Sequence, residues 1–538
     1  MPKDRQKLNH LTGTVTRDSF RKAVGTLRRY TPGSAEQRPA FEYRLSDRRN
    51  REWQRDAAVR GPRPTSEAGP STRLARDFGT ILGLQGAIRT GRVRAEAAVS
   101  AVLENIRTYN HIYNAFAFVN KDAIEQARAI DRRTGRGQSG PTDVALEGIP
   151  SSIKDIIHAA GMPTTASSAV PTGFPTTNDA AAVAEIRRAG AIIVGKTHTH
   201  EFALGVTQPQ SRNPWDPDRV PGGSSGGAAI ALITGMCLGA LGTDTRASIR
   251  VPAALCGTVG YKPTYGLLPT DGIVPLSWSM DHCAVMARTV EDAALVADIA
   301  ARETGTVDLL GSARTAVRGL RIGIPETALV GADVEVADAV SGAARVLSAA
   351  GVTLRDLKEP SDTDFDTANA MGLVLSRCEA AAYHRDWLVR YPAAYTKDVY
   401  EQLDEAARVS AVDYLQAQRY RGEFAERMAR LFVQVDALLM PTTLIPAPRR
   451  DQAEQHLVSL SRNCVPWSFI GFPAISVPGG MTGGGLPIGL QVVGAPCGDG
   501  TVLALAAAIE GSARLDELYD RVPEPWRLSL CSPRWAAS

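Results

Sequence analysis

Apolar and polar residues follow regular patterns from about Asp77 onward. In residues 94–107 the apolar side chains recur three or four positions apart, which places them on one face of an α-helix. Residues 191–194 form a short, continuous apolar run closed by Gly195, which is typical of a buried strand. The same patterns predict further helices over 77–92, 121–132, 178–189, 227–236, 249–255, 334–350 and 500–511, mostly helical structure over 365–433, and further strands over 148–157, 237–241, 320–324, 352–357, 437–440, 474–478 and 487–493.

Predicted strands therefore alternate with predicted helices of ten or more residues. This alternation favours an α/β fold in which helices cover both faces of a β-sheet. The chain has 538 residues, 44% of them hydrophobic, which is enough for a large core. Because neither an internal repeat nor a clear linker follows residue 80, we expect one large domain over residues 76–525.

Residues 1–75 differ from the rest of the chain. They carry many lysines and arginines against few acids, show little apolar periodicity, and include Gly61-Pro62-Arg63-Pro64 near their end. We interpret them as a basic, flexible or loosely docked N-terminal extension; a basic arm that binds a partner and a start codon assigned too early are the alternatives. No apolar segment follows the basic residues as in a secretory signal, and no run of 18 apolar residues predicts a membrane span.

Net charge and cysteine content narrow the class of protein. The formal net charge of +3 is too small to indicate a nucleic-acid partner. The seven cysteines are scattered, odd in number and without a CxxC pair, which argues against a disulfide framework and against a structural zinc site. We therefore expect a cytoplasmic protein.

Two small-residue segments that contain serine carry the candidate chemistry. The segment 221–227 reads Pro-Gly-Gly-Ser-Ser-Gly-Gly, and Ser248, in a second such segment, lies 24 positions after Ser224. Glycine clusters let the backbone turn tightly and bring its N–H groups close to a ligand. A serine in such a turn can act as a nucleophile, and Lys154, at the end of an apolar stretch, is a residue type that can serve as its base.

Residues 223–227 also match the GxSxG pattern of a nucleophile elbow, with Ser225 as the nucleophile. That elbow requires an apolar strand directly before it. Residues 215–221 read Trp-Asp-Pro-Asp-Arg-Val-Pro and are turn-forming instead. The sequence therefore disfavours this alternative.

The order of Lys154, Ser224 and Ser248 resembles that of the amidase signature family. The resemblance runs from about residue 80 to about residue 511 and rests on several segments in the expected order. These segments are Gly195-Lys196-Thr197, Asn213-Pro214-Trp215-Asp216-Pro217, Gly242-Thr243-Asp244-Thr245, Ser248-Ile249-Arg250-Val251-Pro252-Ala253-Ala254, Gly260-Tyr261-Lys262-Pro263-Thr264-Tyr265-Gly266, Gly471-Phe472-Pro473-Ala474-Ile475-Ser476-Val477-Pro478 and Leu486-Pro487-Ile488-Gly489-Leu490-Gln491.

The resemblance implies a large mixed β-sheet in an α/β/α fold and a Ser-Ser-Lys triad. Ser248 would attack the amide carbonyl, Ser224 would follow a cis peptide bond and bridge Ser248 to Lys154, and no metal or organic cofactor would be needed. An unperturbed lysine has a pKa of about 10.4, so a neutral lysine at pH 7 costs about 4–5 kcal/mol unless burial lowers its pKa. The apolar flanks of Lys154 make such burial an expectation.

The family likeness also places the oxyanion hole in the turn at the nucleophile. Its donors would be the backbone N–H groups of Thr245, Arg246, Ala247 and Ser248. The family usually has Gly-Gly where this chain has Arg246-Ala247. Three readings stay open: the turn tolerates these side chains, Arg246 meets an anionic group of the substrate or narrows the pocket, or the hole is damaged and the protein inactive.

Several other polar residues have expected roles outside the triad. Ser225, Asp244 and Arg250 should brace the catalytic turn through hydrogen bonds and charge. The segment His198-Thr199-His200-Glu201 could suggest a metal site with both imidazoles on one face of a strand, but no further ligand cluster is evident, so we expect structural or pocket-lining histidines and no metal. Aromatic candidates for a specificity pocket, equally suited to the core, are Trp387, Tyr395, Tyr400, Tyr414, Trp467 and Phe469.

The sequence thus predicts an amidase that hydrolyses a carboxamide or a substituted amide to a carboxylate plus ammonia or an amine, through an acyl-enzyme on Ser248. One alternative is a glutamine-hydrolysing protein similar to the A-type component of the glutamyl-tRNA amidotransferase, which would need an amidotransferase partner. Others are an acyl-transfer enzyme of specialised metabolism and an inactive binding protein on the same fold. The expected ligand is a small-molecule amide, and a homodimer is left open.

Overall fold

A single mixed sheet organises the chain. The computed structural model describes residues 79–134, 145–174, 177–302 and 307–511, so the predicted N-terminal extension lies outside the described residues. Eleven strands are hydrogen-bonded in the order β1-β3-β2-β4-β6-β5-β10-β11-β9-β7-β8. The strands are β1 (Phe116–Val119), β2 (Pro150–Lys154), β3 (Ile192–Thr197), β4 (Gly239–Asp244), β5 (Val259–Lys262), β6 (His282–Ala287), β7 (Arg321–Pro325), β8 (Thr353–Leu357), β9 (Ala437–Pro441), β10 (Ala474–Met481) and β11 (Pro487–Gly494).

The sheet combines both kinds of pairing. β2 pairs in parallel with β3 and with β4, and β7 pairs in parallel with β8 and with β9. Antiparallel pairs link β1 with β3, β4 with β6, β6 with β5, β5 with β10, β10 with β11 and β11 with β9. The mixed α/β architecture implied by the sequence is therefore confirmed.

Helices cover both faces of the sheet, as strand β4 illustrates. A side chain at Gly239 would meet Ile81 of α4 and Val296 of α10. A side chain at Gly242, three positions later and thus on the opposite face, would meet Ile249, which directly precedes α9. The helices are α4 (Ile81–Arg89), α5 (Ala95–Tyr113), α6 (Ala123–Thr134), α7 (Ala181–Arg188), α8 (Gly226–Ile233), α9 (Arg250–Cys256), α10 (Val290–Ala300), α11 (Leu309–Ala313), α12 (Val334–Ala349), α13 (Asp362–Arg390), α14 (Lys397–Ala406), α15 (Ala411–Leu431), α16 (Leu457–Ser461), α17 (Val465–Phe469) and α18 (Asp499–Glu510).

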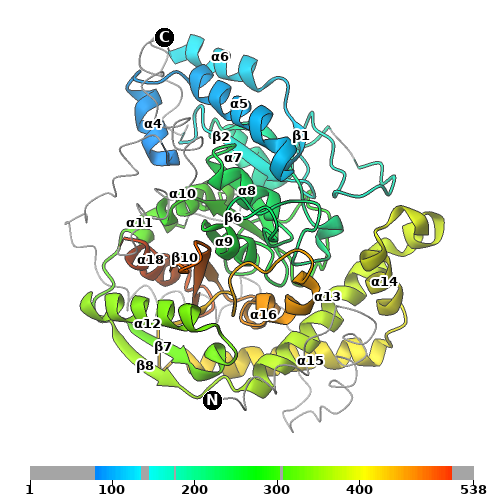
Figure 1. Cartoon of the computed structure of the whole chain (residues 1–538), viewed down its shortest axis with the longest axis vertical. Helices are drawn as coiled ribbons and strands as arrows, with labels where there is room; N and C mark the ends of the chain where they lie inside the picture. The colour runs from blue at the N-terminus through cyan, green and yellow to red at the C-terminus, as the bar shows by residue number, and fades with distance from the viewer. Residues whose placement is uncertain (1–78, 135–144, 175–176, 303–306, 512–538) are drawn as a thin grey trace.

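Figure 1 shows how these elements are arranged. Helices α4, α5 and α6 lie at one end of the molecule, and α12 with β7 and β8 lies at the other. The long helices α13 and α15, with the shorter α14, gather along one side. Helices α8 and α9 are buried along their whole length, which explains their small and apolar residues. None of the helices that the structure describes is long and apolar enough to cross a membrane.

The predicted end of strand β3 at Gly195 is wrong. The strand continues through Lys196 to Thr197. Glycine is needed at position 195 because a Cβ there would lie 2.2 Å from the carbonyl oxygen of Phe118 in the neighbouring strand β1. The glycine therefore permits a close strand–strand approach and does not mark a turn.

Candidate active site

The fold brings Lys154 and Ser248 together at one edge of the sheet. Lys154 is the last residue of β2, and Ser248 lies in the turn between β4 and α9. Because β2 and β4 are neighbouring parallel strands, their carboxyl ends meet at the same edge. Ser224 lies in the loop just before α8, and the peptide bond between Gly223 and Ser224 is cis, as the resemblance implied.

Lys154 contacts two hydroxyl groups. Its Nζ donates hydrogen bonds to Ser224 Oγ at 2.6 Å and to Thr243 Oγ1 at 2.8 Å. Burial lowers the pKa of Lys154 to about 7, although the carboxylates of Asp244 and Asp281 act in the opposite direction. A large fraction of the amine is thus neutral near pH 7 and able to accept a proton.

The two serines lie on adjoining backbone segments. The N–H of Ser225 donates to the carbonyl oxygen of Ser248 at 3.0 Å, which fixes the two segments against each other. Lys154 and Ser224 are 0% exposed, whereas Ser248 retains 6% of its surface. Ser248 is therefore the member of the group that a substrate can reach.

Ser225 does not fit the role of an elbow nucleophile. It is 0% exposed, and its hydroxyl donates to the carbonyl oxygen of Thr243 at 3.3 Å. No apolar strand precedes it, since the described residues before 224 form loops and turns back to the short 3₁₀ helix Glu201–Ala203. Ser225 instead ties the loop to strand β4.

The turn at Ser248 carries a set of free backbone donors. The N–H groups of Thr245, Arg246, Ala247 and Ser248 donate no hydrogen bond to any other residue that the structure describes. Unpaired backbone N–H groups in a buried turn are rare in folded proteins. None of the four residues has a positive φ, so the side chains of Arg246 and Ala247 cause no left-handed strain. The turn thus accommodates both side chains and leaves the amide donors available.

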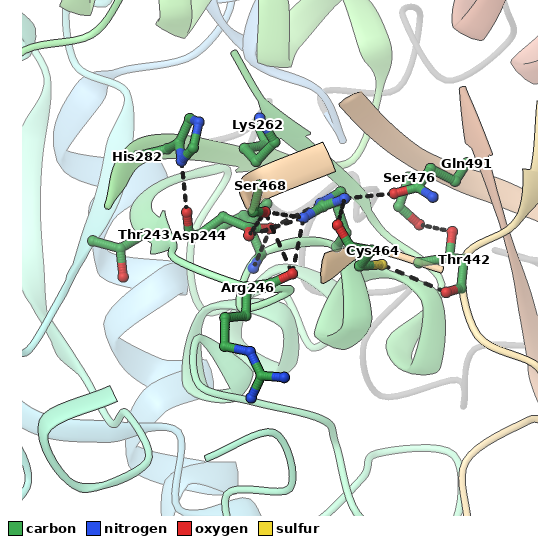
Figure 2. A network of polar contacts seen from close by, with 12 residues as sticks. Thr243, Asp244, Arg246, Lys262, His282, Thr442, Cys464, Ser468, Ser476 and Gln491 are labelled. Atoms are coloured by element: carbon green, nitrogen blue, oxygen red, sulfur yellow. Dashed lines mark hydrogen bonds and ion pairs between the residues drawn. The ribbon is translucent and has the colours of Figure 1, made fainter. Parts of the chain in front are cut away.

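A buried ion pair holds this turn in place. Arg250 Nε donates to Asp244 Oδ2 at 2.9 Å and Arg250 Nη2 donates to Asp244 Oδ1 at 3.0 Å, with both side chains 0% exposed. Arg250 also donates to the carbonyl oxygen of Arg246 at 3.2 Å and to Gln491 Oε1 at 2.6 Å (Figure 2). Burial alone would raise the pKa of Asp244, but the charge and hydrogen bonds of Arg250 outweigh it and lower that pKa.

Asp281 also supports this turn, a role that the sequence analysis missed. Its carboxylate accepts a hydrogen bond from Thr245 Oγ1 at 2.5 Å and two more from the backbone N–H groups of Leu276 and Ser277 at 2.9 and 3.0 Å. Burial raises the pKa of Asp281 to about 7 despite these hydrogen bonds. Nothing in the spacing of the sequence links Asp281 to Thr245, because only the pairing of β4 with β6 brings them together.

Two other buried lysines differ from Lys154 in their partners. Lys196 forms an ion pair with Asp155 at 3.5 Å and donates to Thr164 Oγ1 at 2.8 Å. Lys262 donates to main-chain carbonyl oxygens, including that of Pro263 at 3.2 Å. Both are thus satisfied by the fold, while Lys154 is joined to serine and threonine hydroxyls.

A family model described as Amidase matches residues 97–503. The chain belongs to the amidase signature family. It is 35% identical over 480 residues to the A-type component of the glutamyl-tRNA(Gln) amidotransferase of Myxococcus xanthus, covering 80% of this chain and 96% of that protein. It is also 35% identical over 452 residues to an amidase of Pseudomonas putida, covering 80% and 95%. A crystal structure of an amidase superposes with a TM-score of 0.73 at 33% identity, covering 80% and 99%.

Membership of the amidase signature family makes the chain an amide-hydrolysing enzyme. The predicted fold and enzyme class are therefore confirmed. The roles of the individual residues in this amidase remain predictions, supported by the contacts among Lys154, Ser224 and the turn that carries Ser248.

The histidines of the amidase lie in a loop, so they do not share one face of a strand as the disfavoured metal-site alternative would require. β3 ends at Thr197, and Glu201–Ala203 is a 3₁₀ helix, so His198 and His200 lie in the connection between them. His198 Nδ1 lies 3.0 Å from Ser167 Oγ, and His200 Nε2 lies 3.1 Å from Asp398 Oδ2. Within the described ranges, no group of three or more His, Cys, Asp or Glu side chains could hold a metal ion.

The aromatic candidates all lie in or against the hydrophobic core, in three groups. Trp467 and Phe469 are 0% exposed and belong to the core. Trp387 and Tyr395 belong to a cluster of rings with Phe202, whose centroid lies 6.2 Å from that of Trp387 and 5.8 Å from that of Tyr395. Tyr400 and Tyr414 are partly buried against the core.

Replacing Arg250 of the amidase by methionine should lower the free energy of unfolding by about 3–5 kcal/mol, because Asp244 would keep a buried charge without its partner. Urea unfolding at pH 7 measures this. The double variant Asp244→Asn/Arg250→Met should recover part of the loss. An unfolding energy in Arg250→Met equal to that of the parent would show that the pair does not hold the turn.

Replacing Thr243 by valine should lower kcat/KM about tenfold, because Lys154 loses one hydroxyl acceptor while the side-chain shape is kept. The pKa of Lys154 should also fall, since the lost hydrogen bond favours the protonated amine. Rates measured from pH 6 to 9 test both effects. Thr243→Ser keeps the hydroxyl and should resemble the parent; an equal loss in both variants would point to packing instead.

Proposed function

We propose that this amidase hydrolyses a carboxamide or a substituted amide to a carboxylate plus ammonia or an amine, through an acyl ester on Ser248. The observation that carries the proposal is the contact of a buried lysine, of pKa about 7, with Ser224 at 2.6 Å. Ser248 lies on the adjoining segment and retains exposure.

The proposed first half-reaction transfers one proton in a relay. Neutral Lys154 accepts the proton of Ser224 while Ser224 takes that of Ser248, so that the oxygen of Ser248 can attack the amide carbonyl carbon. A new C–O bond forms and the carbonyl electrons move to oxygen. When the tetrahedral intermediate collapses, the C–N bond breaks and the protonated Lys154 returns its proton, through Ser224, to the leaving nitrogen.

The second half-reaction repeats the relay with water. Water gives one proton to the same relay while its oxygen attacks the ester carbon. When the C–O bond to Ser248 breaks, the relay returns that proton to Ser248 Oγ, and the released carboxylic acid ionises in water to the carboxylate. In both steps the negative oxygen would be held by the free N–H groups of the turn 245–248. Loss of one such donor typically costs about 10²–10³ in rate.

An experiment with hydroxylamine tests the acyl-enzyme. Two substrates with the same acyl group, a primary amide and the corresponding anilide, are hydrolysed in the presence of hydroxylamine. A common acyl-enzyme predicts the same ratio of hydroxamate to acid from both substrates, because the leaving group has already departed. Ratios that differ between the two substrates would contradict the shared intermediate. A large excess of hydroxamate at low hydroxylamine would favour the acyl-transfer alternative.

Glutamine hydrolysis for a partner protein is the second candidate function, because the Myxococcus xanthus relative is named as part of an amidotransferase. In that case the isolated chain should release little ammonia from glutamine and none from simple amides. Turnover of simple amides by the chain alone favours the independent amidase.

The six cysteines among the described residues are all free, which supports the cytoplasm as the place of action.

A further inference from the structure

Arg246 directs its side chain away from the ion pair that braces its own turn. Its carbonyl oxygen accepts hydrogen bonds from Arg250 at 3.2 Å and from Ser468 Oγ at 3.3 Å. Figure 2 shows the guanidinium on the other side of the backbone, pointing away from Asp244 and Ser468. The Nε atom is buried without a hydrogen-bond partner, and the side chain forms no ion pair with a described residue.

A second arginine without a carboxylate partner, Arg377, lies on helix α13. Arg377 is 4% exposed, and its Nε donates to Gln402 Oε1 of α14 at 2.8 Å. Neither of its Nη atoms makes a hydrogen bond or an ion pair with another residue that the structure describes. The hydrogen bond to Gln402 therefore fixes the guanidinium of Arg377, and its two Nη atoms are left free to bind a ligand.

Packing between helices places α13 beside the catalytic turn. A side chain at Gly372 of α13 would meet Val465 and Phe469 of α17. Ser468 of the same helix α17 contacts the carbonyl oxygen of Arg246. Helix α17 therefore connects the helix of Arg377 directly to the turn that carries Arg246 and Ser248.

The charge of Arg246 is close enough to Arg377 to affect its pKa. Burial lowers the pKa of Arg377 to about 9, and the positive charge of Arg246 contributes to this fall. Among the described residues Asp398 alone opposes it, and Asp398 lies against His200. Burial lowers the pKa of Arg246 to about 10, with no carboxylate of the described residues to offset it.

Arg246 is partly buried and Arg377 is buried. Two such like charges without a counterion are costly, and an anion between them lowers that cost. Guanidinium groups bind carboxylates through paired, charge-assisted hydrogen bonds. We propose that Arg246 and Arg377 together bind a carboxylate of the substrate, so that the enzyme prefers amides that carry a carboxylate a few bonds from the scissile carbonyl. This inference rests on the proposed function, because it assigns the substrate class of the same site.

Matched pairs of substrates test the inference. The probes are the monoamides succinamic, glutaramic and adipamic acid, each compared with its diamide, in which a neutral carboxamide replaces the carboxylate. The parent enzyme should show a higher kcat/KM on at least one monoamide than on the matching diamide. Arg246→Gln and Arg377→Gln should each lower kcat/KM on that monoamide about 10- to 100-fold, mainly through KM. In both variants the diamide rate should fall much less than the monoamide rate, because the diamide offers no carboxylate to the guanidinium groups.

Controls separate charge recognition from folding and from pocket size. Arg385→Gln changes an exposed arginine on the same helix and should keep the monoamide preference. Arg246→Lys keeps the charge and should retain part of the preference, and the melting temperature of each variant shows whether it folds. Arg246→Gly restores the residue that the family usually has there and should lose the preference while still hydrolysing diamides.

The outcomes also distinguish this inference from the proposed function. Equal rates on monoamides and diamides in the parent would overturn carboxylate binding and leave amide hydrolysis standing. A rise in Arg246→Gln on charged and neutral substrates alike would show that Arg246 narrows the pocket, and would overturn the inference. Absence of turnover on every amide, together with failure of Ser248 to react with a fluorophosphonate, would instead contradict the proposed function itself.

Discussion

Replacing Ser248 by alanine should lower kcat by roughly 10⁴- to 10⁶-fold, the loss expected when a serine nucleophile is removed. Ser248 retains exposure beside the free N–H groups of its turn, so substrate should still bind. KM, or the dissociation constant of an amide, should therefore change far less than kcat. Steady-state rates and calorimetric binding measure the two effects separately.

The neighbouring Ser225 supplies a matched control for this experiment. Its hydroxyl donates to the backbone of Thr243 and contacts no member of the proposed relay. Ser225→Ala should keep most of the activity, with a loss of at most about tenfold, corresponding to one lost hydrogen bond. If Ser225→Ala lost all activity while Ser248→Ala kept it, Ser225 would be the nucleophile and Ser248 would not.

Replacing Lys154 by methionine should lower kcat/KM by roughly 10²- to 10⁴-fold, the usual contribution of a general base. Methionine fills a similar space without the amine. The variant should fold at least as stably as the parent near neutral pH, because burial opposes protonation of the lysine that it removes. Chemical unfolding of both proteins shows whether the loss of rate reflects chemistry.

The dependence of kcat/KM on pH is a second test of Lys154 as the general base. Neutral Lys154 is the active form, so kcat/KM should rise about tenfold per pH unit below the pKa of about 7 and level off above it. Asp281 has a pKa in the same range, but its charge raises the pKa of Lys154. In Asp281→Asn the inflection should therefore persist at a lower pH. Disappearance of the inflection in this variant would assign it to Asp281.

The fold could be predicted largely from the alternation of patterns along the chain. Long or strongly apolar segments, such as those of α12 and β3, were found within a few residues of their observed positions. The short strands β1, β5 and β6 were not predicted. β5, Val259–Lys262, has four residues that include a glycine and a buried lysine, so only its pairing with β6 and β10 makes it a strand.

The candidate site was predictable where its residues lie in dense local motifs. Lys154, Ser224 and Ser248 each stand in such a segment, and the structure brings them to one edge of the sheet. Asp281 and Arg377 could not be found this way. Asp281 reaches the turn through strand pairing, and Arg377 lies on α13, which packs against α17 beside the turn; these segments are distant in the sequence.

The effect of Arg246-Ala247, which stand where the family resemblance led us to expect Gly-Gly, could also not be predicted from the sequence alone. The sequence left three interpretations open, because it does not show whether this turn needs a positive φ. Glycine adopts a positive φ easily, whereas the side chains of Arg246 and Ala247 would be strained by it. The backbone has no positive φ there, so strain is not the consequence of the two side chains. What the replacement adds is a cation, two residues before Ser248, whose Nε has no partner in the described structure. The direction of this side chain depends on the three-dimensional packing.

The central claim is that Ser248 is a nucleophile activated by Lys154. Its most direct test is the intact mass of the purified protein after treatment with a fluorophosphonate, with the adduct mapped by peptide mass spectrometry. We predict one adduct per chain on Ser248, formed much more slowly in Lys154→Met and absent in Ser248→Ala. A folded parent protein that acquires no adduct, or acquires it on another residue, would contradict the account.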